Sequence, residues 1–385
     1  MPHEAIVQAV AERAGAMLAF LESVVNMDSP TEDKALADKV GDAFQAKAES
    51  LGLVATRDVQ AGFADNRICR LAKGRGPRVL MIGHFDTVYE AGTCARRPFR
   101  IEGERALGPG ALDMKGGLTI GLFALEALRA ALGEIPLDVT FLFNSDEEIG
   151  SPQSRKAIFA EVPRHDLALV LEPGRPGPGI TIGRKGVGIF RMAIEGREAH
   201  AGAEPEKGIN SIVEAAHKIL AIQALNDAGA GTTVTPGVVA GGTKPYVVPG
   251  LTRLEVDCRV ASAAEQARIE HAMAAITASA TVPGTRATLS GGFHRPPMET
   301  SPAAMEFIAR LQAVARAVGY PLGTATTGGA SDGNLPASAG LPTIDGLGVH
   351  GGRAHSEEEF IEIASLEAKC RVLACFLAEL AASDR

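Results

Sequence analysis

The sequence predicts an α/β protein with a mostly parallel sheet that is sandwiched by helices and a second domain inserted into it. Short apolar runs alternate with segments of helical periodicity over the first part of the chain. A hydrophobic fraction of 46% over 385 residues is enough to bury sizeable cores in two domains. From about residue 185 the order of elements changes, which indicates the insertion.

The first domain is expected to begin with two helices, followed by three strands and then by alternating helices and strands. Ser29-Pro30-Thr31-Glu32 has the composition of a helix start with Ser29 as the N-cap, and Gly52 would end that helix. The expected helices are 5–26, 30–51, 115–132 and one after Pro152, and the expected strands lie near 54, 68 and 80 and at 139–143 and 167–171.

The inserted domain is expected over residues 185–295, so the first domain would comprise residues 1–184 and 296–385. The order β-α-β-β-α-β is that of a ferredoxin-like module. Its expected strands lie near 189–194, 232–239, 252–260 and 287–289, and its helices at 209–224 and 263–280.

Three acidic side chains, Asp146, Glu147 and Glu148, follow the apolar run 139–143. Carboxylates crowded at a strand end are costly unless a positive charge lies among them, and a metal ion is the obvious candidate. Glu147 and Glu148 could then divide the work, one binding metal and the other transferring protons.

Further ligand-type side chains stand at strand ends or in Gly-rich loops. His84 and Asp86 follow the apolar run 78–83 and would point to the same side of the chain. Taken singly, each residue has an ordinary alternative, such as a structural histidine or an N-cap. Together they converge where α/β folds place their sites, and two histidines with three carboxylates suit zinc, cobalt or manganese. The other candidates are Asp113, Glu172 and His355.

Six sequence blocks carry a resemblance to a known family: residues 83–89, 98–100, 108–110, 143–148, 200–206 and 355–356. In this order they resemble the co-catalytic di-zinc metallopeptidases, which include aminoacylases, acetylornithine deacetylase, succinyl-diaminopimelate desuccinylase and glutamate carboxypeptidase. The chain is most similar to the bacterial, folate-cleaving glutamate carboxypeptidases. The resemblance covers nearly the whole chain.

The resemblance implies two Zn²⁺ ions, for which Co²⁺ or Mn²⁺ could substitute. Asp113 would bridge the two ions. His84 and Glu172 would complete the first site, and Glu148 and His355 the second.

The resemblance also assigns the catalytic residues. Glu147 would act as general base and acid, and Asp86 would orient His84 through its other ring nitrogen. His200 would reach the active site of a partner subunit and stabilise the oxyanion. The peptide bond 113–114 would be cis.

Substrate binding is expected to involve a carboxylate. By resemblance, Arg259 and Arg295 would bind it, and Gly328 and Gly329 would offer backbone amides to it. A surface or interdomain ion pair is the alternative for each arginine. In this family a glutamate at position 172 favours carboxypeptidases and deacylases over aminopeptidases.

The function implied is metal-dependent hydrolysis of the amide bond of an N-acyl or peptidyl amino acid with a free carboxylate, as in glutamate carboxypeptidases. The alternatives are an N-acetyl- or N-succinyl-amino acid deacylase and a non-catalytic amino-acid-binding relative. Tyr246 stands near the place where the family often has Asn, so strict glutamate specificity does not follow.

The expected partners are a small substrate and a second copy of the chain. A net charge of −8 argues against nucleic acid and anionic membranes. No targeting segment or membrane span is evident, and five cysteines without paired spacing fit a reducing compartment, so we expect a cytoplasmic protein. The resemblance implies a homodimer formed through the inserted domain.

Overall fold

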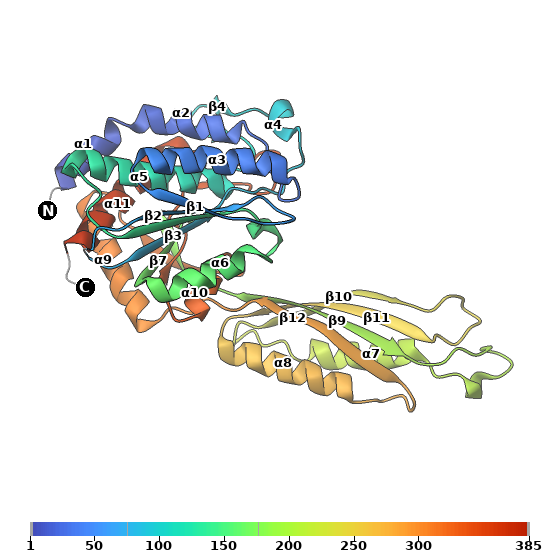
Figure 1. Cartoon of the computed structure of the whole chain (residues 1–385). Helices are drawn as coiled ribbons and strands as arrows, with labels where there is room; N and C mark the ends of the chain where they lie inside the picture. The colour runs from blue at the N-terminus through green and yellow to red at the C-terminus, as the bar shows by residue number, and fades with distance from the viewer. Residues whose placement is uncertain (1–2, 75, 176, 383–385) are drawn as a thin grey trace. The chain divides into compact units, whose positions relative to one another are not determined.

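The computed structural model describes residues 3–74, 76–175 and 177–382, which form two compact units (Figure 1). Unit 1 contains the residues up to Ile182, Thr300–Thr326 and the residues from Ser331 onward. Unit 2 contains Gly183–Glu299 and Thr327–Ala330. None of the described helices is both long and apolar enough to cross a membrane.

Six strands form the main sheet of unit 1 in the order β1-β2-β6-β3-β7-β14. The last four run parallel, whereas β2 pairs antiparallel with β6 and β1 pairs antiparallel with β2. This arrangement confirms the predicted α/β class with a mostly parallel sheet. The strands are β1 (Val54–Asp58), β2 (Asn66–Leu71), β3 (Val79–His84), β6 (Val139–Asn144), β7 (Leu167–Val170) and β14 (Thr343–Ile344).

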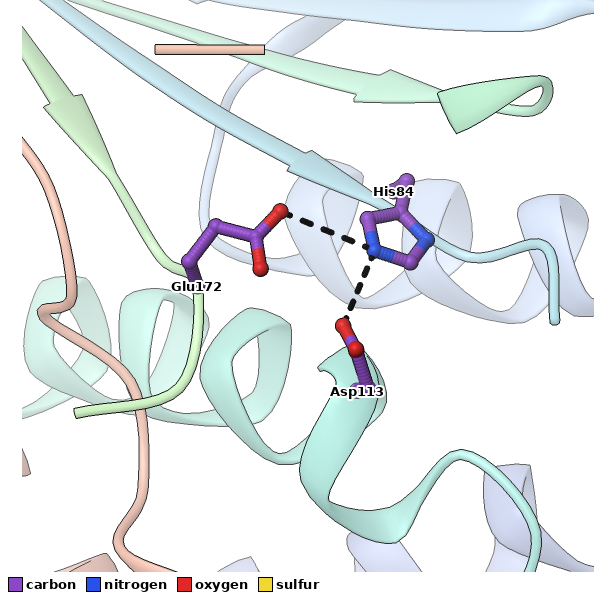
Figure 2. Close-up of side chains that lie close together, drawn as sticks. All are labelled: His84, Asp113 and Glu172. Carbon is purple, nitrogen blue, oxygen red and sulfur yellow. Dashed lines mark hydrogen bonds and ion pairs between the residues drawn. The ribbon is translucent and has the colours of Figure 1, made fainter. Parts of the chain in front are cut away.

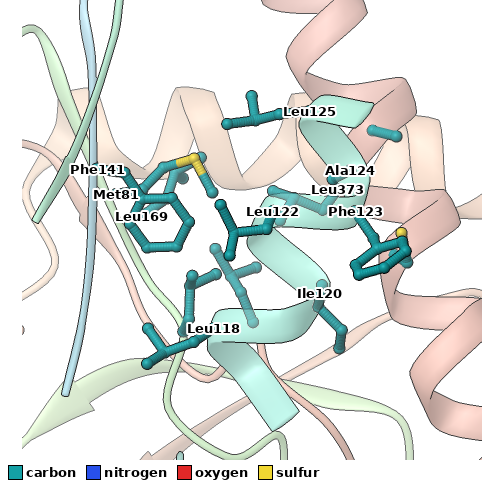
Figure 3. Close-up of a cluster of buried hydrophobic side chains, with 14 of the residues drawn as sticks. Met81, Leu118, Ile120, Leu122, Phe123, Ala124, Leu125, Phe141, Leu169 and Leu373 are labelled. Atoms are coloured by element: carbon teal, nitrogen blue, oxygen red, sulfur yellow. The ribbon is translucent and has the colours of Figure 1, made fainter. Parts of the chain in front are cut away.

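Both faces of this sheet are buried, which explains why its central strands are buried throughout and mainly apolar. Met81 of β3 belongs to the larger core, and its neighbour Leu80 belongs to the smaller core on the other face. On the larger side, Leu118 and Leu122 of helix α5 lie close to the sheet residues (Figure 3). That side is covered by α1 (His3–Ala11), α2 (Ala14–Val25), α3 (Lys34–Ser50), α5 (Gly116–Leu132), α9 (Pro302–Ala317) and α11 (Ile363–Ala381), and the other by α6 (Ser154–Glu161) and α10 (Asn334–Ser338).

Two of the predicted helix boundaries are wrong. Residues 5–26 form two helices, α1 and α2, rather than one. Helix α3 begins at Lys34, and its N-cap is Asp33, whose side chain accepts the N–H of Leu36. Ser29 instead accepts the backbone N–H of Thr87 through its carbonyl oxygen at 2.8 Å. The segment that resembles a helix start therefore holds the chain that follows β3.

Unit 2 has the predicted β-α-β-β-α-β order. Its antiparallel sheet has the strand order β10-β11-β9-β12, and both helices share one apolar core with it (Figure 1). In chain order the elements are β9 (Gly186–Glu195), α7 (Ser211–Gln223), β10 (Thr233–Gly241), β11 (Leu251–Val260), α8 (Ala263–Ala278) and β12 (Arg286–Arg295).

Candidate metal centre

The carboxyl ends of three parallel strands carry most of the predicted ligands. His84 is the last residue of β3, Glu147 and Glu148 follow β6 in the short turn η2 (Glu147–Ile149), and Glu172 follows β7. Parallel strands end at the same edge of a sheet, so these side chains gather there.

Asp113 reaches this edge from a separate loop. It lies in the short helical turn η1 (Ala111–Lys115), in which Asp113 and Met114 have non-helical dihedral angles. The peptide bond between these two residues is cis, as the resemblance implied.

The first group of ligand-type side chains consists of His84, Asp113 and Glu172 (Figure 2). Nε2 of His84 lies 3.2 Å from Oδ1 of Asp113 and 3.8 Å from Oε1 of Glu172. One ligand atom from each residue lies within 4.8 Å of the others, which is close enough to share one ion.

The second group consists of Asp113, Glu148 and His355. Nε2 of His355 lies 3.4 Å from Oδ2 of Asp113 and 3.2 Å from Oε2 of Glu148. His355 is carried by the loop between β15 (Gly351–Gly352) and β16 (Phe360–Glu362). The two oxygens of Asp113 therefore face two different histidines, which is the arrangement of a bridging carboxylate.

The electrostatics of these groups favour a cation. Burial opposes a charge on His84, but hydrogen bonds to Asp113 and Asp86 outweigh it and raise its pKa well above the usual value. Hydrogen bonds to Asp113 and Glu148 raise the pKa of His355 to about 10. Burial raises the pKa of Glu148, whereas hydrogen bonds from both histidines overcome burial and lower the pKa of Asp113. The carboxylates thus favour positive charge at this place, and divalent ions would supply it with neutral histidines. The nitrogen and oxygen donors fit zinc, cobalt or manganese.

Asp86 contacts both His84 of the first group and the turn η2 that carries Glu147 and Glu148. It is fully buried, and its Oδ1 lies 3.3 Å from Nδ1 of His84. Its carboxylate accepts the backbone N–H groups of Glu147 and Glu148 at 3.3 Å each and the hydroxyl of Thr31 at 2.8 Å. Asp86 therefore holds the His84 ring with Nε2 facing the ligand group and fixes the turn that carries Glu147.

His350 precedes His355 by five residues and is the competing histidine of this segment. It is buried in a different place, and burial together with the nearby Lys369 lowers its pKa to about 4. The structure brings His355, and not His350, to the acidic cluster.

His200 lies in unit 2, where its backbone bridges to Val247. Its Nδ1 accepts the backbone N–H groups of Gly202 and Ala203 at 3.2 and 3.0 Å. Because Nδ1 acts as an acceptor, the hydrogen of the neutral ring lies on Nε2. The exposed ring can therefore donate a hydrogen bond from Nε2.

The two predicted substrate arginines also lie in unit 2. Nε of Arg259 donates to both carboxylate oxygens of Asp257, at 3.0 and 3.1 Å, which is the ion pair expected under the alternative. Arg295 is buried at the end of β12. The ligand groups described above belong to unit 1.

The predicted glycine loop contacts an arginine that the sequence did not single out. Gly328 and Gly329 lie in the segment of unit 2 that ends at Ala330. Nη1 of the buried Arg184 lies 3.4 Å from the carbonyl oxygen of Gly329 and 3.5 Å from that of Ala330. The only sequence signal for Arg184 is its place at the end of the short apolar strand β8 (Gly179–Arg184), and many surface arginines share such a place.

The comparison with known proteins identifies the family. The sequence model described as Peptidase family M20/M25/M40 matches residues 80–379. The chain is 31% identical to carboxypeptidase G2 of Pseudomonas sp. (strain RS-16) over 97% of this chain and 92% of that protein. It is also 31% identical to acetylornithine deacetylase of Myxococcus xanthus, over 57% of this chain and 60% of that one. A solved M20 family metallo-carboxypeptidase of Sulfolobus solfataricus superposes with a TM-score of 0.73 at 17% identity, covering 94% of this chain and 98% of that chain. Together with the clustered ligand-type residues, these matches show that the chain belongs to peptidase family M20/M25/M40 and is a metal-dependent hydrolase.

Proposed function

We propose that the enzyme is a glutamate-carboxypeptidase-like hydrolase of N-acyl or short peptidyl amino acids that works with two divalent metal ions. The observation that carries this proposal is the position of Asp113, whose two carboxylate oxygens face His84 and His355 separately. Zinc is the ion that the donor set suits best, with cobalt or manganese as substitutes.

The mechanism assigns each step to a side chain. When bound, the ions would polarise the scissile carbonyl and make the attacking water more acidic. Glu147, which is partly exposed beside the ligand groups, accepts the proton of that water and delivers it to the leaving nitrogen. Asp86 keeps the His84 ring and the Glu147 turn in place. No covalent intermediate is needed.

We further propose that the enzyme acts as a homodimer in which His200 serves the active site of the partner subunit. The hydrogen on Nε2 of His200 would donate to the substrate oxygen that gains negative charge. Unit 2 would provide the dimer interface, in keeping with the family resemblance. A cytoplasmic location remains a prediction from composition.

The substrate proposal rests on the similarity to carboxypeptidase G2 over nearly the whole chain and on Glu172. Arg295, Gly328 and Gly329 are the groups that we expect to bind the substrate carboxylate, and Arg259 would have to leave Asp257 to contribute. A short-acyl deacylase is the second candidate. It is favoured by the similarity to acetylornithine deacetylase and by the exposed Tyr246 near the place of the family's usual Asn.

The test is hydrolysis of a panel of substrates by the zinc- or cobalt-loaded enzyme. The panel combines acetyl, succinyl, benzoyl and pteroyl groups with glutamate, aspartate and apolar amino acids. Preference for acidic amino acids supports the carboxypeptidase proposal, whereas preference for short acyl groups regardless of the amino acid supports the deacylase. The absence of turnover with two bound ions would count against both.

A further inference from the structure

A buried carboxylate beside the loop that carries Asp113 has no part in the mechanism above. Glu359 is 2% exposed, whereas Glu357 and Glu358, which precede it, are exposed. An unsatisfied carboxylate would be costly at such a place, so its hydrogen-bond partners indicate what it does there.

Three of these partners are backbone N–H groups of the loop that carries Asp113. Oε1 of Glu359 accepts the backbone N–H groups of Leu112 at 2.8 Å and Asp113 at 3.0 Å. Oε2 accepts the N–H of Gly110 at 3.1 Å, and Gly110 has a left-handed φ of 72°. The loop amides thus form a concave cradle around the carboxylate, and the carboxylate fixes the backbone of Asp113.

The fourth partner, Tyr89, lies between Glu359 and the loop of His355. The Tyr89 hydroxyl lies 2.6 Å from Oε2 of Glu359 and 2.8 Å from the carbonyl oxygen of Ser356, and its single hydrogen serves one acceptor at a time. The guanidinium of Arg97 covers the Tyr89 ring, with its carbon 4.9 Å from the ring centre. Because Ser356 directly follows His355, the Tyr89 hydroxyl lies within hydrogen-bond reach of both the His355 loop and this carboxylate.

We infer that Glu359 is a positioning residue that sets the bridging Asp113 and, through Tyr89, the His355 loop for metal binding. This inference rests on the proposed two-metal function. Its physical basis is that Glu359, which lies in the same loop as His355, accepts hydrogen bonds from the loop that carries Asp113 and from Tyr89 in the segment that follows His84. A carboxylate that only filled space would have no need of donors from two segments beside the ligand set.

The test is titration of the metal-free protein with Zn²⁺ alone, followed by absorption spectra of the Co²⁺-loaded protein. Glu359→Gln keeps the shape of the side chain. Its NH₂ group, however, must face one of the hydrogen-bond donors that the carboxylate now contacts. We expect its zinc affinity to fall by ~10-fold or more, as for other groups that orient ligands, with an altered Co²⁺ spectrum. Tyr89→Phe keeps the cradle of backbone N–H groups and should lower the affinity for only one of the two zinc ions. Glu357→Gln makes the same chemical change on an exposed neighbour and should bind zinc as the wild type does.

The outcomes separate this inference from the proposed function. Wild-type affinity for two zinc ions in folded Glu359→Gln would overturn the positioning role alone. If Glu359→Gln does not fold, Tyr89→Phe decides, and unchanged binding of both ions overturns the link to His355. A wild-type protein that binds fewer than two zinc ions would overturn the proposed function and with it the inference. Two ions bound without turnover of the substrate panel would count against the proposed reaction, while the titration of the variants would still decide the role of Glu359.

Discussion

Two adjacent glutamates at the end of β6 have different surroundings, although the sequence gives them the same chemistry. Glu148 contacts His355 at 3.2 Å and belongs to a ligand group, whereas Glu147 belongs to neither group. Backbone N–H bonds from both residues to Asp86 fix this difference, because they hold the turn in one orientation. The proposed metal ligand and the proposed proton carrier are therefore neighbours in the sequence.

This separation predicts opposite effects of one chemical change. In Glu147→Gln we expect kcat to fall by a factor of ~10²–10⁴ or more, because the proton acceptor is lost, while zinc content stays at the wild-type level. Glu148→Gln should instead lose zinc from one site. Zinc titration and turnover of a confirmed substrate measure both effects, and wild-type turnover in metal-loaded Glu147→Gln would disprove the general-base role.

A second residue-scale prediction concerns Lys369, whose Nζ is buried in helix α11 and donates to the carbonyl oxygen of Gly346 at 2.9 Å. Burial lowers its pKa from 10.5 to about 7. Between these values the unfolded chain binds the proton and the folded chain does not, so the contribution of Lys369 to the free energy of unfolding rises with pH. It is lost as the pH falls toward 7.

Lys369→Met removes this titration. The unfolding free energy of the wild type minus that of the variant should therefore increase from pH 7 to pH 10. Urea unfolding at a series of pH values measures it. A difference that does not change with pH would show that Lys369 keeps its ordinary pKa.

At the scale of the elements, helix α5 and the residue directly after strand β7 meet without space for a side chain. A Cβ added at Gly117 would lie 1.9 Å from the carbonyl oxygen of Leu171, the residue before the predicted ligand Glu172. The position of α5 therefore depends on this glycine, and so does the strand end that carries one ligand.

Gly117→Ala should force the helix and the strand end apart. We expect the free energy of unfolding to fall by ~1–3 kcal/mol and zinc to bind more weakly. Gly15→Ala is the matched control, because Gly15 lies in helix α2 with no atom near the added methyl, and it should stabilise the protein by ~0.5–1 kcal/mol. Denaturant unfolding and zinc titration compare the two, and equal stability of both variants would contradict the close contact.

The elements also show what could be predicted from sequence and what could not. Apolar runs predicted the central strands, because burial on both faces leaves a local signal, and the ligand-type residues stand directly at their ends. The helix start at Ser29 was wrong, because its backbone is recruited by a residue 58 positions away. Glu359 could not be distinguished from Glu357 and Glu358, since only contacts with distant loops decide which one is buried.

At the scale of the whole molecule, unit 2 exposes apolar side chains on neighbouring elements. Leu220 of α7 is 69% exposed, and Val238 and Val239 of β10 are 55% and 58% exposed. Among the described strands, β10 pairs only with β11, so its outer edge is open. An open edge and an adjacent apolar helix suit the two-fold interface proposed for unit 2.

A mixing experiment tests whether His200 acts on the partner subunit. Glu147→Gln and His200→Ala should each be nearly inactive alone. In a mixed dimer, one active site combines an intact Glu147 with the partner's His200, so random mixing should restore about a quarter of wild-type activity. Unmixed variants at the same total concentration are the control. No recovery in dimers shown to be mixed would place His200 at the site of its own chain.

Most of unit 2 lies between Ile182 and Thr300, which also sets the order in which the ribosome makes the proposed ligands. His84, Asp113, Glu148 and Glu172 all precede the insertion, whereas His355 follows it. A growing chain that is still being extended through unit 2 therefore already contains every residue of the first group but lacks His355 of the second. Under the two-metal proposal, the second metal site cannot form until unit 2 has been made.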